Sequence, residues 1–75
     1  MFRAFVFINV EIGADVEVLK AIKKIRNVKE AHQIYGVYDL IAKIESETIE
    51  QLNNIVTARI RRLRKVRSTV TLTEK

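Results

Sequence analysis

The stretch Tyr35-Gly36-Val37-Tyr38-Asp39 lies almost at the middle of this 75-residue chain and divides it into two similar halves. It holds a glycine with an aromatic residue on each side, and apolar-rich segments precede and follow it. Because glycine has backbone freedom that a side chain would deny, the stretch predicts the tip of a β-hairpin. Each half contains one extended apolar segment and one helical segment, and this near symmetry determines the fold that we expect.

Residues 2–10 predict a strand that is apolar on both faces. Phe5 and Phe7 lie between the positions of the regularly alternating face, so neither side of this strand is polar throughout. We expect such a strand at the centre of a sheet, where both of its faces are covered. The alternating face consists of Phe2, Ala4, Val6, Ile8 and Val10.

A helix is expected over residues 15–26, followed by a less regular strand over residues 28–35. The helical segment starts with acidic residues and ends with basic ones, as the helix dipole favours, and Asn27 is expected to end it in the left-handed conformation. Apolar residues within 28–35 recur at a spacing of three, which a bulge or an exposed edge would explain. The apolar stripe of the helix consists of Val18, Leu19, Ile22 and Ile25.

The second half of the chain predicts a strand, a helix and a closing strand. The strand after the glycine has Ile41 on a second, partly apolar face, and its first face carries Tyr38, Leu40, Ala42 and Ile44. Ser46 or Thr48 is expected to cap the helix, with Gln51 at capping-box spacing from Thr48. The buried stripe of this helix is expected to be Ile49, Leu52, Val56, Ile60 and Leu63. The closing strand, residues 66–73, has one face of Val66, Ser68, Val70 and Leu72 and a polar face of Arg67, Thr69, Thr71 and Thr73.

The order βαββαβ predicts an α+β, ferredoxin-like fold with a four-stranded antiparallel sheet and both helices on one face. The first and third strands are then central, and Phe5, Phe7 and Ile41 would lie bare on the face without helices. Leaving them in water would forfeit several kcal/mol at about 25 cal/mol per Å². We therefore expect copies of the chain to dimerise sheet to sheet, in a dimeric α/β barrel-like assembly. The alternative is that these are scattered surface aromatics.

Composition and length limit the function classes. Residues 1–75 are expected to form a single domain, which buries only about 60% of the surface of its unfolded chain. With no cysteine and one histidine, a disulfide or a typical zinc site is excluded. The longest apolar run, residues 4–8, is too short to cross a membrane, and the start of the chain lacks a secretory-signal pattern, so we expect a cytoplasmic protein. No catalytic constellation or cofactor motif is present, which argues against an enzyme.

Positive charge is concentrated in one segment. The formal net charge is +5, and residues 59–67 hold six basic residues and no acid: Arg59, Arg61, Arg62, Arg64, Lys65 and Arg67. Clustered arginines can bind nucleic-acid phosphates without reading sequence. The interpretation that we favour is a solvated helix end, since basic residues complement the dipole there. A small basic nucleic-acid-binding protein stays open as an alternative.

Asp39 is the carboxylate for which the sequence offers no structural role. It follows the glycine turn and is expected on the face away from the helices, near aromatic residues. Such a carboxylate can hold an ammonium group or a backbone amide. A hydrogen bond within its own turn is the competing interpretation.

Three segments together resemble the effector-binding module of the Lrp/AsnC family of leucine- and asparagine-responsive transcriptional regulators. They are residues 28–31 (VKEA), residues 36–41 (GVYDLI) and residues 66–71 (VRSTVT). The module is called RAM, for regulation of amino-acid metabolism, and the similarity covers essentially all 75 residues.

This resemblance implies dimers that form through sheet faces, with Phe5, Phe7 and Ile41 in the interface, and rings of dimers, often octamers. It also implies that a small effector, typically an amino acid, binds between dimers. The ligand contacts of the family fall here on Gly36, Val37, Tyr38 and Asp39, with Thr69 and Thr71 as further contacts.

Full family members carry a helix-turn-helix domain, whereas this chain starts directly at the first strand. It therefore resembles a stand-alone module, which is expected not to bind DNA by itself and to co-assemble with full-length regulators. A purely structural oligomerisation module is the alternative.

Overall fold

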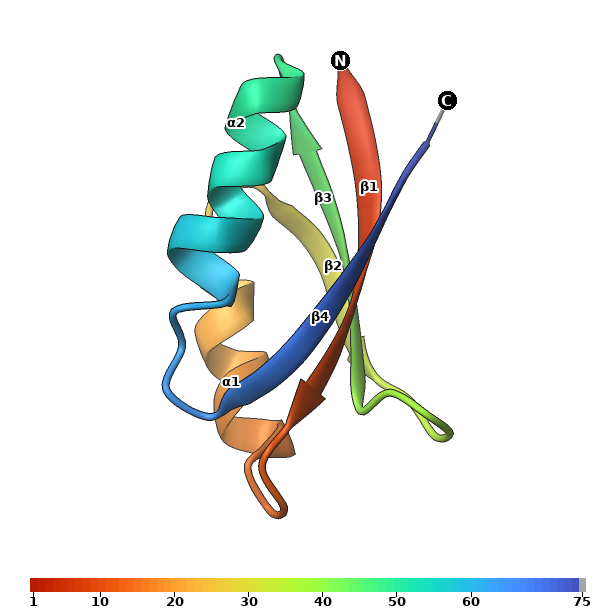
Figure 1. Cartoon of the computed structure of the whole chain (residues 1–75), viewed down its shortest axis with the longest axis vertical. Helices are drawn as coiled ribbons and strands as arrows, with labels where there is room; N and C mark the ends of the chain where they lie inside the picture. The colour runs from red at the N-terminus through yellow and green to blue at the C-terminus, as the bar shows by residue number, and fades with distance from the viewer. Residues whose placement is uncertain (75) are drawn as a thin grey trace.

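The computed structural model describes residues 1–74 and has the expected ferredoxin-like architecture. Its elements are β1 (Phe2–Val10), α1 (Asp15–Lys23), β2 (Val28–Gln33), β3 (Leu40–Ser46), α2 (Ile49–Asn54), the π-helix η1 (Ile55–Ile60) and β4 (Val66–Thr73). The four strands form one antiparallel sheet in the order β2-β3-β1-β4. Both helical segments lie on the same side of this sheet (Figure 1). The expected βαββαβ fold and the central places of β1 and β3 are confirmed.

The core lies between the helices and one face of the sheet. Every second residue of β1 and β3 points into it, because alternate side chains of a strand face opposite sides. The buried apolar residues of the two central strands are Ala4, Val6, Ile8, Val10, Leu40, Ala42 and Ile44, and those of the helices and their ends include Val18, Ile22, Ile25, Leu52, Ile55, Val56 and Ile60. No helix in residues 1–74 is long and apolar enough to cross a membrane.

The end of α1 differs from the expectation. The helix stops at Lys23, and the next residue, Lys24, keeps right-handed helical dihedrals. Among the described residues only glycines have positive φ, so the left-handed conformation expected for Asn27 is wrong. Asn27 instead fixes the start of β2: its Nδ2 donates to the Glu45 carbonyl at 2.8 Å, and its own carbonyl accepts from the Glu45 amide at 3.0 Å. The side chain ties two strands together and does not cap a helix.

The second helix starts with the expected cap. Thr48 Oγ1 accepts a hydrogen bond from the Gln51 amide at 3.0 Å, and Gln51 Oε1 accepts one from the Glu47 amide at 3.3 Å. Thr48 is therefore the N-cap, while Ser46 is buried and donates to the Thr48 carbonyl at 2.6 Å. The two bonds supply an acceptor for one amide of the first turn and for the amide that precedes the cap.

Thr48→Ala is expected to lower the free energy of unfolding by about 1 kcal/mol, because one amide of the first helical turn loses its acceptor. For a chain of this length the melting temperature should fall by about 4 to 8 °C, which circular dichroism can follow. Thr57→Ala is the matched control. Thr57 Oγ1 donates to the Asn53 carbonyl in mid-helix, at 2.9 Å, and caps nothing. An equal loss in both variants would contradict the role of Thr48.

The second half of this helix is a π-helix, which alters the expected apolar stripe. The Arg61 amide donates to the Val56 carbonyl, five residues back, at 2.8 Å. Ile55 and Val56 are both buried as a result, whereas Ile49, expected in the stripe, is 43% exposed. The expectation assumed a uniform α-helix, and the wider turn rotates neighbouring side chains into the core.

Both edge strands contain an irregularity. The register of β2 shifts between Val28 and Glu30, as its spacing of three suggested. The register of β4 shifts where Val10 of β1 pairs with Val66 and Asn9 pairs with Ser68, so that Arg67 is the additional residue. From Ser68 onward, each side chain of β4 therefore points to the face opposite to the one that it would occupy in an uninterrupted strand starting at Val66.

The face without helices is apolar along its centre. Phe7 pairs with Ile41 of β3 on one side and with Val70 of β4 on the other, and residues paired across antiparallel strands share a face. Phe5 pairs with Leu72 in the same way. Val70 is 40% exposed and Leu72 is 56% exposed. We call Phe5, Phe7, Ile41, Val70 and Leu72 the open face.

Candidate ligand-binding site

The glycine hairpin joins β2 to β3 at the end of the molecule opposite both chain termini (Figure 1). The Ile34 amide donates to the Asp39 carbonyl at 3.0 Å and closes the loop. Gly36 has a φ of 132°, a conformation that side chains disfavour, which confirms the expected glycine turn. Tyr35 and Val37 project from the tip and are exposed. The hairpin therefore places Asp39 at its base, beside the end of β1.

Asp39 accepts a hydrogen bond from β1. Its Oδ2 receives the Val10 amide at 2.8 Å, and its own amide donates to the Ile8 carbonyl at 3.0 Å. Because β3 starts at Leu40, which pairs with Ile8, no strand residue of β3 lies opposite Val10. The carboxylate takes the place of a backbone acceptor there. Asp39 thus has the structural role that the sequence did not reveal, and its partner is a neighbouring strand and not its own turn.

A hollow of about 450 Å³ lies on one side of Asp39. It is lined by Asn9, Val10, Ile12, Asp39, Arg67 and Ser68. Asn9 Nδ2 donates to Ser68 Oγ at 3.4 Å across the β1 and β4 strands. The hollow has one carboxylate and one guanidinium on its walls, the two groups that recognise an ammonium and a carboxylate. Its chemistry suits a small zwitterion.

A second hollow, of about 480 Å³, lies on the other side of Asp39. It is lined by Asp15, Gln33, Ile34, Tyr35 and Asp39. Gln33 Nε2 donates to Asp15 Oδ2 at 2.6 Å, which links β2 to the start of α1. The lining has two carboxylates and no basic side chain, so it lacks a partner for a carboxylate ligand. We therefore place the candidate site in the hollow that contains Arg67.

The remaining residues expected in the site line neither of these two hollows. Gly36 and Val37 form the tip and line neither hollow. Tyr38 precedes β3, so strand alternation does not apply to it, and its ring packs on the open face with its centroid 5.5 Å from that of Phe7. Its expected place on the face of Leu40 is therefore wrong.

Thr69 and Thr71 lie on the helix side of the sheet. Thr69 pairs with Ile8, and Thr71 pairs with Val6, whose side chains are buried in the core. The β4 residues that share a hollow with Asp39 are Arg67 and Ser68. The sequence placed Arg67 in the basic run and on the polar face of the closing strand. Nothing in the sequence signals the bulge that brings Arg67 into the lining of the hollow that contains Asp39.

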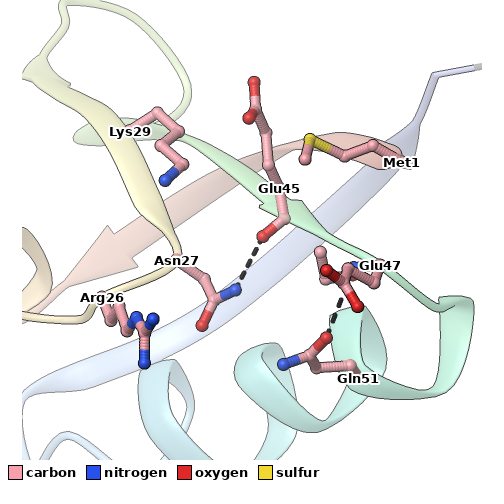
Figure 2. Close-up of a pocket in the computed structure, with 8 residues that line it drawn as sticks. Met1, Arg26, Asn27, Lys29, Glu45, Glu47 and Gln51 are labelled. Carbon is pink, nitrogen blue, oxygen red and sulfur yellow. Dashed lines mark hydrogen bonds between the residues drawn. The ribbon is translucent and has the colours of Figure 1, made fainter.

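A third hollow, of about 470 Å³, lies at the opposite end of the sheet (Figure 2). Its lining is Met1, Arg26, Asn27, Lys29, Glu45, Ser46, Glu47 and Gln51. The Asn27 and Gln51 side chains both hydrogen-bond the backbone, at Glu45 and Glu47. These two amides are engaged in holding the loops, which makes this hollow a weaker candidate for a ligand.

The Glu45 carboxylate points away from Asn27 and Gln51 (Figure 2). Its Oε2 lies 3.4 Å from Nε of Arg3, and Arg3 Nη1 donates to Glu74 Oε2 at 3.1 Å. The hydrogen bond to Glu74 and the attraction of Glu74 and Glu45 raise the pKa of the Arg3 guanidinium. Glu45, although it lines the third hollow, is therefore engaged in a surface ion pair with Arg3.

Comparison with known proteins supplies the family. A family model described as the Lrp/AsnC ligand binding domain matches residues 3–73. The chain belongs to the Lrp/AsnC ligand-binding domain family. A search of curated proteins finds no match.

Among residues 1–74, no three histidine, cysteine or acidic side chains are grouped so that they could share a metal ion.

Solved structures, some of similar size and some about twice as long, resemble this Lrp/AsnC domain over 97% or more of its length. FFRP-DM1 is 33% identical, with a TM-score of 0.97 and full coverage of both chains. A hypothetical protein from Pyrococcus horikoshii is 33% identical, with a TM-score of 0.94, and is matched over 90% of its length by the entire present chain. AsnC of E. coli is 22% identical, with a TM-score of 0.91, and 97% of this chain covers 50% of AsnC. The likeness to AsnC establishes the fold.

Proposed function

We propose that residues 1–75 form a single cytoplasmic module that binds an amino acid or a similar small effector and has no enzymatic activity. The module would assemble with other copies and with full-length Lrp/AsnC regulators, which would carry the recognition of DNA sequence. The observation that carries this proposal is the hollow in which Asp39 and Arg67 face the same space. An α-amino acid presents the two complementary charges.

The family supports the class of ligand. The matched domain is described as ligand-binding, and one structure of the same fold is a transcriptional regulator from Neisseria meningitidis in complex with L-Met. That regulator is 12% identical, so the identity of its ligand does not transfer to this chain. Asp39 would accept the ammonium group through the oxygen that Val10 leaves free, and Arg67 would receive the carboxylate. Ser68 and Asn9 would contribute neutral polar contacts at the rim, and Gly36, Val37 and Tyr38 would shape the hairpin beside it.

The open face supports assembly. Its five apolar residues lie on adjacent strands, and the helices cover only the other side of the sheet. A second copy packed against Phe5, Phe7 and Ile41 would remove this apolar surface from water. We therefore include a sheet-to-sheet dimer in the proposal, with rings of dimers such as an octamer as the larger assembly. Because the candidate hollow is open to solvent at the end of the sheet, a neighbouring dimer could close it.

Isothermal titration calorimetry against each of the common amino acids tests the proposal. We expect saturable heat with a small subset of them, on protein whose assembly has been verified by light scattering. Decarboxylated and deaminated analogues of a ligand should bind more weakly, because each lacks one of the two charges. If an intact assembly gives no heat with any amino acid, effector binding is wrong, and a purely structural oligomerisation module becomes the better description.

A further inference from the structure

A run of basic residues near the end of the chain overlaps the candidate ligand site only at Arg67. We call residues Arg59–Arg67 the basic segment; it contains six basic residues and no acid, while the rest of the chain has eight basic and nine acidic residues. The segment runs from the end of η1 through the loop that leads into β4 (Figure 1). The entire net positive charge of the chain therefore comes from this one segment.

The helix dipole explains only part of this charge. Arg59 is the basic residue of the last turn of η1, and Arg61 is its C-cap. Arg62, Arg64 and the residues that follow lie beyond the helix, in the connection and in β4. Since the influence of the dipole falls off within the last turn, the basic residues beyond Arg61 need another explanation.

Intramolecular ion pairs do not supply that explanation. Lys65 Nζ lies 3.0 Å from Glu17 Oε1, which ties the loop to α1. Within residues 1–74 the arginines of the basic segment form no ion pair, and all five are exposed. Five like charges in nine residues repel one another unless counterions or a polyanion neutralise them.

The backbone that carries these arginines is anchored to the rest of the fold. Ile60 is fully buried and Leu63 packs against the core, so Arg61, Arg62 and Arg64 are left on the outer side of the connection. The Leu63 amide donates to the Ile60 carbonyl at 3.1 Å, the Val66 amide donates to the Leu63 carbonyl at 3.1 Å, and the Glu11 amide donates to the Lys65 carbonyl at 2.9 Å. A connection anchored in this way loses little conformational freedom on binding.

We propose that the basic segment binds the sugar-phosphate backbone of duplex DNA without reading its sequence. Guanidinium groups match phosphate oxygens in a bidentate geometry, and the charge density of DNA favours neutralisation by clustered arginines. The segment contains no exposed large apolar side chain, which an interface with a protein would need at its centre. It also lacks aromatic residues on which unpaired bases could stack. The family resemblance implied a module that does not bind DNA by itself, and this proposal departs from that expectation. The binding would add to the proposed effector function and does not depend on it.

Fluorescence anisotropy with labelled duplexes of about 20 base pairs and unrelated sequences tests the proposal at several salt concentrations. We expect similar affinities for all duplexes and a steep decrease from about 50 to 200 mM salt. The variant Arg61→Gln/Arg62→Gln/Arg64→Gln should bind at least about tenfold more weakly at low salt. The slope of log affinity against log salt should become shallower by about 2.7, the contribution of three phosphate contacts.

Lys20→Gln/Lys23→Gln/Lys24→Gln is the matched control, because it removes the same charge from α1 and its C-cap. Its affinity should stay well above that of the arginine variant, and circular dichroism and light scattering should show both variants to be folded and assembled alike. Equal losses in the two variants would mean that net charge alone acts, and would overturn the proposal. Absence of binding to any duplex at low salt would also overturn the proposal. So would an affinity for poly-glutamate equal to that for DNA of the same total charge, because this result would indicate an acidic protein partner.

Discussion

Phe7→Glu is expected to convert the proposed sheet-to-sheet dimer into folded monomers. Phe7 lies at the centre of the open face, half-buried between Ile41 and Val70. Covering the exposed half of a phenylalanine, about 75 Å² at about 25 cal/mol per Å², stabilises an interface by about 2 kcal/mol in each copy. In a symmetric dimer the substitution is present in both copies, so the interface loses this contribution twice and two carboxylates become buried. The dissociation constant should therefore rise by about a thousandfold or more.

Light scattering coupled to size-exclusion chromatography measures this change, with circular dichroism to verify that the monomer is folded. Val16→Glu is the matched control, because Val16 is an exposed apolar residue in the first turn of α1, where the helix dipole favours a carboxylate. Its assembly should equal that of the unchanged protein. If Phe7→Glu keeps the original mass, or if the unchanged protein is itself monomeric at micromolar concentration, the sheet-to-sheet interface is wrong.

Hydrophobic periodicity was sufficient to predict the order and the layers of the elements. The second apolar face of residues 2–10 identified β1 as a central strand, and the glycine turn gave the hairpin between β2 and β3. These features are local and repeated, so several residues indicate each of them. The spacing between Thr48 and Gln51 predicted the cap for the same reason, because both partners lie within one turn.

The features that the sequence did not reveal depend on a single additional residue or on a distant partner. The π-turn brings Ile55 into the core, and the bulge at Arg67 moves Val70 and Leu72 to the open face. Neither irregularity has a distinctive residue pattern. Asn27 was expected to stop a helix, since its partner Glu45 is 18 residues away in the sequence. Non-local contacts of this kind are determined by the assembled sheet.

For the candidate site, the sequence identified one lining residue, Asp39, and missed others. Asp39 was identified by its position after the glycine turn, and the structure places it in the wall of two hollows. Arg67 and Ser68 were not identified, because the shift in register that brings them opposite Asn9 depends on the pairing of β1 with β4. Thr69 and Thr71 were named from a family resemblance, and their side chains share the face of Ile8 and Val6.

Asp39→Asn is expected to separate the two roles of this side chain, which are to accept the hydrogen bond from the Val10 amide and to bind the ammonium group of the proposed ligand. The amide oxygen of asparagine can still accept the hydrogen bond from Val10, which the carboxylate accepts at 2.8 Å. The free energy of unfolding should therefore change by less than about 1 kcal/mol. Loss of the charge should weaken an amino-acid ligand by about ten- to a hundredfold, the range of a charge-assisted hydrogen bond. Calorimetry and thermal unfolding of the same sample measure both quantities.

Two further variants make this prediction specific. Asp39→Ala also removes the acceptor of Val10, so it should destabilise the fold by about 1 to 3 kcal/mol in addition to losing the ligand. Asp15→Asn neutralises the carboxylate of the neighbouring hollow and should leave affinity unchanged. A loss of affinity in Asp15→Asn together with full affinity in Asp39→Asn would place the ligand in that hollow. A ligand held between Asp39 and Arg67 requires the opposite result, because the only guanidinium that lines either of these two hollows is on the side of Arg67.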